Sequence, residues 1–131
     1  MKSKYENSSA RERLAREIAS EGIILLKNEN EMLPFGKETV AVFGRTQVDT
    51  IKCGTGSAFC ESEYCINVLD GMIGAGINVY APLAEKYRAW CAENTIATYG
   101  VWGSGSHIMS EMPLEESDFS EAAKSCEKAV F

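Results

Sequence analysis

The sequence is poor in histidine and in closely spaced cysteines. It has a single histidine, His107, and five cysteines that form no Cys-x-x-Cys pair: Cys53, Cys60, Cys65, Cys91 and Cys126. A zinc site needs several nitrogen or sulfur ligands in tight groups, and a disulfide framework needs an even number of suitably spaced cysteines. We therefore expect free thiols, as in a reducing cytoplasm, and neither a metal site nor a cofactor.

The sequence also lacks an excess of positive charge and a long apolar run. Its 13 lysines and arginines are outnumbered by 19 aspartates and glutamates, which gives a formal net charge of −6. Nucleic acids and anionic membranes attract clustered positive charge, so neither is an expected partner. No apolar stretch approaches the roughly 20 residues that span a bilayer, and the first residues lack the apolar segment of a signal peptide. The expected location is the cytoplasm.

The remaining composition is that of a folded protein. The chain has 131 residues, 45% of them hydrophobic, which is enough for one domain with a buried core. Apolar residues at helical spacing predict helices at about residues 9–26, 61–74 and 82–99. Short apolar runs at 39–43 and 77–80 are typical of buried strands. Strand, helix and strand in this order form a parallel unit, so we predict a Rossmann-like α/β sandwich with a mainly parallel sheet flanked by helices.

The C-terminal third is less regular. Residues 100–114 are rich in glycine and serine without a period, which predicts a functional flap or a partly disordered loop. Asp118-Phe-Ser-Glu121 is typical of a capping box and predicts a helix through Cys126. Residues 129–131 resemble the start of a third strand, at which the sequence stops. We expect a tail at 1–9 and one truncated domain at 10–131, whose exposed strand edges favour homo-oligomers or aggregation.

The stretch from Arg45 to Ser57 is the first candidate for a functional surface, because ligands of open α/β sheets bind where loops leave the carboxyl ends of strands. Its sequence Gly54-Thr55-Gly56-Ser57 suggests a phosphate cradle. However, Phe59 stands where the dinucleotide fingerprint needs glycine or alanine, and Lys52 precedes the turn, whereas a Walker loop has its lysine after the glycine. A flavodoxin-like nucleotide-binding protein therefore remains the weaker alternative.

No catalytic constellation is evident from the residues alone. His107 is expected to be an exposed loop residue, and Trp102 in the same loop either stacks on a ligand or packs into the core. The chain has abundant carboxylates, most of which fit charges at helix N-termini or solvated loop positions better than an acid–base pair. They are Glu61, Glu63, Glu111, Glu115, Glu116 and Asp118.

One succession of motifs is more specific. Residues 15–28 read Ala-Arg-Glu-Ile-Ala-Ser-Glu-Gly-Ile-Ile-Leu-Leu-Lys-Asn, and Leu33-Pro34 and then Val-Ala-Val-Phe-Gly-Arg at 40–45 follow. Lys-Cys-Gly-Thr-Gly-Ser at 52–57 and Glu-Met-Pro-Leu at 111–114 come next. In this order they resemble the second, α/β-sandwich domain of glycoside hydrolase family 3, over about residues 10 to 131. Cys53 departs from the glycine or serine that relatives often carry. The early position of the domain resembles the subgroup with reversed domain order.

The resemblance implies part of a retaining glycosidase of β-glucosidase type, which removes terminal β-linked sugars from an oligosaccharide or glycoside. In the family, the nucleophilic aspartate lies on a separate (β/α)-barrel domain. The acid–base glutamate usually lies on a loop beyond the strand that here begins at Ala129. Neither has a counterpart in this sequence, and a retaining mechanism needs both carboxyl groups about 5 Å apart. We therefore expect the polypeptide to be inactive alone and the barrel of the same parent chain to be its partner.

The resemblance also implies that the loop from Arg45 faces the barrel and forms one wall of the sugar site. Arg45 is expected either to contact the sugar or to bridge the domains. The expected substrate-binding residues are Arg45, Lys52, Gly54, Thr55, Gly56, Ser57 and Trp102. A stand-alone carbohydrate-binding or interaction module without catalysis remains the alternative.

Overall fold

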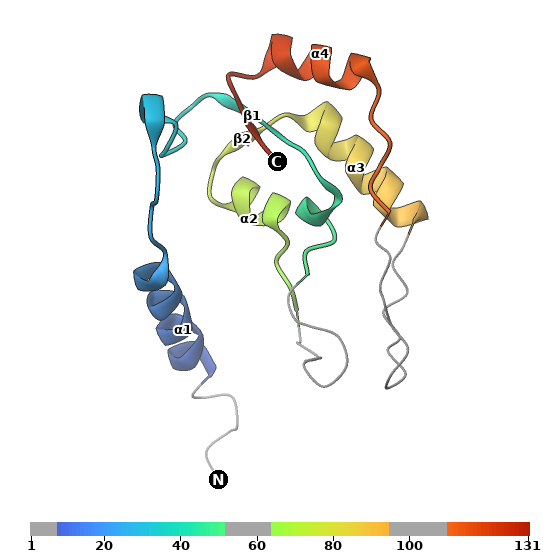
Figure 1. The fold of residues 1–131 in the computed structure, drawn as a ribbon. Coiled ribbons are helices and arrows are strands. Elements are labelled where there is room, and N and C mark those ends of the chain that lie inside the picture. Colours follow the sequence, from blue (N-terminus) through green and yellow to red (C-terminus); the bar gives the residue numbers. More distant parts are fainter. Residues whose placement is uncertain (1–7, 52–63, 95–109) are drawn as a thin grey trace. The chain divides into compact units, whose positions relative to one another are not determined.

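The computed structural model describes residues 8–51, 64–94 and 110–131. The chain divides into two units, Met1–Pro34 and Phe35–Phe131, and each is described by itself (Figure 1). Among the described helices, none combines the length and the apolar character needed to cross a membrane.

The first unit contains the helix α1 (Ser8–Gly22) and the short 3-10 helix η1 (Glu29–Glu31). The prediction that the first helix continues to residue 26 was wrong. The helix ends at Gly22 because glycine and the β-branched Ile23 and Ile24 that follow it are poor helix formers. Beyond it, the Asn28 side chain donates to the carbonyl of Leu33 at 2.8 Å and accepts from its amide at 2.9 Å, which closes residues 28–33 into a loop.

The second unit is built on a parallel sheet of three strands, as predicted. The strands are β1 (Thr39–Val42), β2 (Asn78–Val79) and β3 (Lys128–Val130), in the order β2-β1-β3. Val40 of β1 lies opposite Val79 on one side and Lys128 on the other, in parallel register. β1 is the central strand, and Val40, Ala41 and Val42 are all buried although they alternate between the two faces of the sheet, which explains its uninterrupted apolar sequence.

Three helices surround this sheet: α2 (Val68–Gly74), α3 (Ala81–Glu93) and α4 (Glu116–Ser125) (Figure 1). Their existence was predicted, but one end of each helix was not. The second helix starts at Val68 instead of at residue 61 or 62, because the Asn67 side chain caps it by accepting from the amide of Asp70 at 2.7 Å. The third ends at Glu93 instead of near residue 99.

The fourth helix begins earlier than predicted. Asp118 was expected to open the capping box, but Glu115 is the capping residue and Asp118 supplies the return bond to its amide at 2.9 Å. A capping box opened by Glu115 and one opened by Asp118 would each place an acidic side chain beside the unpaired backbone amides of the first helical turn. The sequence pattern alone therefore does not distinguish the two positions.

The main core lies between β1, α3, α4 and the segment that precedes α4. Its buried residues are Ala41, Phe43, Leu83, Tyr87, Met112 and Ala122. Because side chains alternate along a strand, Ala41 and Phe43 point to this core while Val40 and Val42 point to the other face of the sheet. Residues 110–114, the described end of the predicted Gly/Ser-rich loop, are anchored here because Met112 is 3% exposed.

Candidate functional site

The carboxyl end of β1 is the place where the chain changes direction across the sheet. From β1 the chain proceeds to β2 on one side, and it later returns as β3 on the other side. Segments that leave neighbouring strands at such a switch point diverge and leave a crevice, which is the usual ligand site of open α/β sheets. Gly44 follows β1 with φ of +95°, a value that favours glycine. The 3-10 helix η2 (Arg45–Gln47) comes next.

The two backbone amides at this turn are held by side chains from distant parts of the chain. The amide of Gly44 donates to the Tyr87 hydroxyl oxygen at 2.9 Å. The amide of Arg45 donates to both carboxylate oxygens of Glu111, at 3.0 and 2.9 Å. Glu111 Oε1 also accepts from the amide of Met112 at 2.9 Å. The turn after β1 is thereby tied to α3 and to the segment before α4.

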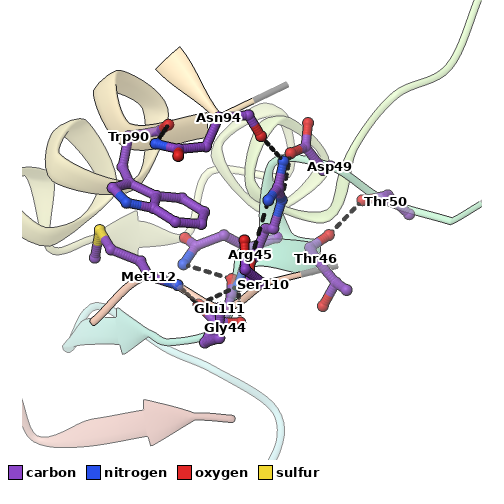
Figure 2. A network of polar contacts seen from close by, with 11 residues as sticks. Gly44, Arg45, Thr46, Asp49, Thr50, Trp90, Asn94, Ser110, Glu111 and Met112 are labelled. Atoms are coloured by element: carbon purple, nitrogen blue, oxygen red, sulfur yellow. Dashed lines mark hydrogen bonds and ion pairs between the residues drawn. The ribbon is translucent and has the colours of Figure 1, made fainter. Parts of the chain in front are cut away.

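The side chain of Arg45 is buried at 3% exposure and surrounded by internal partners (Figure 2). Its Nε donates to Asp49 Oδ2 at 2.8 Å, its Nη1 to the carbonyl of Ser110 at 3.1 Å, and its Nη2 to the carbonyl of Asn94. The guanidinium also lies over the Trp90 ring, 4.9 Å from its centroid. One side chain therefore joins residues 94 and 110, which flank residues 95–109.

Thr50 has a similar position at the other predicted loop. Its hydroxyl donates to the carbonyl of Thr46 at 2.7 Å and accepts from the amide of Val68 at 3.1 Å. This hydroxyl therefore joins the two ends of residues 51–67, because Thr50 precedes them and Val68, the first residue of α2, follows them. Figure 2 shows Thr46 and Thr50 beside Arg45 in the same network.

The side chain of Gln47 also stabilises the turn after β1. Its side chain is buried and its Nε2 donates to the carbonyls of Val42 and Gly44, at 2.8 and 3.2 Å. These two acceptors fix the orientation of the amide, so Oε1 points away from them. Within the described part of the chain Oε1 has no hydrogen-bond partner. A buried acceptor of this kind needs a donor such as a water molecule.

The electrostatic environment keeps two buried groups neutral. Burial raises the pKa of Tyr87, and the negative charge of Glu111 acts in the same direction. Burial, followed by the charge and hydrogen bond of Asp49, raises the pKa of Cys91 to about 11. A thiol with such a pKa is a poor nucleophile. Cys65, Cys91 and Cys126 are free, as expected of the described cysteines.

The carboxylates divide into two groups. Glu115, Glu116 and Asp118 lie at the N-terminus of α4, as predicted. Lys86, at 2.6 and 2.7 Å, and the amide of Glu115 lower the pKa of Asp118. Glu111 is exposed, as expected of a loop carboxylate, but its carboxylate also accepts from the amides of Arg45 and Met112, which was not predicted. The only local signal was a charge directly before the apolar Met-Pro-Leu.

The structure tests few of the predicted site residues. Of these, Arg45 alone lies among the described residues, and its predicted contact with a sugar or with another domain stays a prediction. Lys52, Gly54, Thr55, Gly56, Ser57 and Trp102 lie outside the described residues, as does His107. Residues 8–51, 64–94 and 110–131 contain no group of three His, Cys, Asp or Glu side chains that could hold a metal ion.

Comparison with known proteins gives concordant results. The model of the glycosyl hydrolase family 3 C-terminal domain matches residues 23–131. A β-glucosidase of Ruminococcus albus is 36% identical over 118 residues, and β-glucosidase A of Butyrivibrio fibrisolvens is 31% identical over 120 residues. These alignments cover 88% and 89% of this chain but only 12% and 14% of the relatives.

Solved structures agree with this match. A β-glucosidase from Paenibacillus barengoltzii superimposes with a TM-score of 0.80 at 39% identity, over 89% of this chain and 13% of its own. β-Glucosidase 3B from Thermotoga neapolitana, in complex with α-D-glucose, superimposes with a TM-score of 0.73 at 30% identity, over 92% of this chain and 17% of its own. The chain therefore belongs to glycosyl hydrolase family 3, as a domain of the C-terminal type.

Proposed function

We propose that this chain forms one wall of the sugar site of a β-glucosidase-type enzyme, and that the two catalytic carboxylates come from elsewhere in the parent protein. The observation that carries the proposal is that the chain matches β-glucosidases over nearly its whole length while spanning 12% and 14% of theirs. The substrate class is then a terminal β-linked sugar of an oligosaccharide or glycoside. The partner is the (β/α)-barrel of the same parent protein.

The order of the strands supports the position of this wall. β1 and β3 are parallel neighbours, so chain leaving β3 and chain leaving β1 start from the same edge of the sheet. By family resemblance, the acid–base glutamate lies on a loop beyond the third strand. The stretch from Arg45 to Ser57 would then begin beside that loop, as expected of a wall that faces the scissile bond.

The network around Arg45 supports a rigid attachment of this wall. Arg45 binds the carbonyls of Asn94 and Ser110, and Thr50 binds the amide of Val68. The predicted residues Lys52 to Ser57 and Trp102 belong to the two segments whose ends are joined in this way. Sites that bind small ligands require such preorganised supports, because a displacement of about 1 Å weakens binding and catalysis.

Two measurements on the 131-residue polypeptide test this proposal. The first is hydrolysis of an aryl β-glucoside, for which we expect no turnover above background, since a retaining mechanism needs two carboxyl groups about 5 Å apart. The second is the melting temperature in the presence of glucose. Glucose at ten times its dissociation constant should stabilise the folded state by about 1.4 kcal/mol.

A matched pair of lysine variants makes the binding test specific. Lys52→Ala should abolish the stabilisation by glucose, whereas Lys37→Ala, two residues before β1 and thus at the opposite edge of the sheet, should retain it. Equal glucose responses of the two variants, or no response of the unmodified chain, would contradict the proposed wall. Turnover well above background would contradict the proposed lack of catalytic groups. Cytoplasmic location and homo-oligomer formation also remain proposals, checked by fractionation and by light scattering.

A further inference from the structure

The turn after β1 contains an internal anion at a place where related architectures bind an external one. In Rossmann-type folds, backbone amides that follow the first strand cradle a phosphate group. Here the amide of Arg45 donates to both carboxylate oxygens of Glu111, and the amide of Met112 donates to one of them. Glu111 therefore acts as a built-in anionic ligand for this turn.

We propose that Glu111 is a positioning residue of the sugar site, which fixes the backbone at Arg45 and through it the guanidinium that joins residues 94 and 110. The proposal rests on the proposed function only for the identity of the ligand. The position of the turn itself follows from the contacts of Glu111 and is tested separately below.

The chemistry of the contact explains why a carboxylate stands here. Both oxygens of Glu111 face the same amide, at 3.0 and 2.9 Å, so the bond does not depend on one rotamer of the carboxyl group. A glutamine has a single acceptor oxygen, and its NH₂ group would face the amide of Arg45 on the other side. The guanidinium of Arg45 pairs with Asp49, whereas the carboxylate of Glu111 binds backbone amides. The backbone amides supply the remaining stabilisation of the negative charge.

The exposure of Glu111 suggests a direct test by chemical rescue. Glu111 is itself exposed, although the turn that it holds is buried. In Glu111→Ala a small carboxylate anion from solvent can therefore reach the vacated amides. Loss of the acceptor should lower the melting temperature by about 5 °C, and acetate or formate should restore it in a saturable manner, whereas chloride at the same ionic strength should not.

The fluorescence of Trp90 reports on Arg45 directly, since the guanidinium lies over this ring. The chain has two tryptophans, so Trp102→Phe leaves Trp90 as the only tryptophan. In that background Glu111→Ala should shift the emission of Trp90, and acetate should reverse the shift. Glu121→Ala, which removes an exposed carboxylate of α4, is the matched control and should have no effect. Glu111→Gln, a milder change that should fold, is expected to shift the emission partway and not to respond to acetate.

The last measurement is the stabilisation of the Glu111→Ala variant by glucose. With Trp102 intact, Glu111→Ala should lose the stabilisation by glucose and regain it when acetate is present. If the unmodified chain shows no glucose response, the proposed function fails, and the rescue of Trp90 emission still decides the role of Glu111. Wild-type emission in Glu111→Gln, or a shift in Glu111→Ala that acetate does not reverse, overturns the inference.

Discussion

Replacement of Arg45 by lysine separates the internal role of this residue from its predicted contact with sugar. Lysine keeps the positive charge but replaces a planar fork of five donors by a single ammonium group, so the change is not conservative at a site with several acceptors. The ammonium can remain near Asp49. It cannot at the same time reach the carbonyls of Ser110 and Asn94, which the guanidinium binds with separate nitrogens.

The cost follows from the interactions that are lost. A hydrogen bond from a charged donor contributes about 1.5 to 3 kcal/mol. Ser110 and Asn94 are exposed, so water can replace part of each bond in the variant. The loss of each bond should therefore lower the free energy of unfolding by about 1 kcal/mol. Loss of the guanidinium from the Trp90 ring adds about 0.5 to 1 kcal/mol. The sum is about 2.5 to 3 kcal/mol, or a decrease in melting temperature of roughly 10 °C for a chain of this size.

Urea unfolding followed by circular dichroism measures this difference, and Arg88→Lys is its matched control. Arg88 forms an ion pair with Asp70 in which the two side chains are 42% and 48% exposed. Such surface pairs contribute about 0 to 1 kcal/mol. Equal costs for the two arginine variants would refute the role assigned to the buried guanidinium. A large loss of glucose binding with unchanged stability would instead favour direct contact between Arg45 and the sugar.

Three further predictions concern the core and the titrating groups. Tyr87→Phe removes the acceptor of the partly buried Gly44 amide and should cost about 1 to 2 kcal/mol in urea unfolding, while Tyr80→Phe should cost less. The pKa of Cys91 is raised to about 11, so its contribution to stability is present below pH 9, is lost as the pH rises toward 11, and should vanish in Cys91→Ala. The hydrogen bond from Lys128 lowers the pKa of Glu38 to about 2, so its contribution is present above pH 4.5 and is lost as the pH falls toward 2. Lys128→Met should raise this pKa, as measured by NMR titration.

Strands and the cores of helices were predicted from the sequence because their signals are local. The run at 39–43 has only apolar residues after its first position, and the spacing of Leu83, Tyr87 and Cys91 places all three on the buried side of α3. Helix ends were predicted less well because they depend on single side chains. Asn67 determines where α2 starts, and Asn94 follows the last residue of α3.

The site network was not predicted, since its partners are far apart in the sequence. The bond between the amide of Arg45 and Glu111 spans 66 positions, and that between its guanidinium and Asn94 spans 49. No local period or motif links such positions, and an acidic residue in a polar loop looks the same whether it is solvated or bound. Arg45 itself was found because it lies two residues beyond the predicted strand, although no sequence pattern indicated that its side chain is buried.

The same network supplies a physical argument against the nucleotide-binding alternative. Sequence spacing disfavoured it because Phe59 and Lys52 stand at the wrong positions. In the structure, the amide of Gly44 is already bonded to Tyr87 and that of Arg45 to the carboxylate of Glu111. A phosphate approaching this turn would meet a negative charge where a phosphate cradle offers free amides. A neutral sugar meets no such repulsion, so the carboxylate that closes the turn to phosphates remains compatible with a wall of a glycoside site.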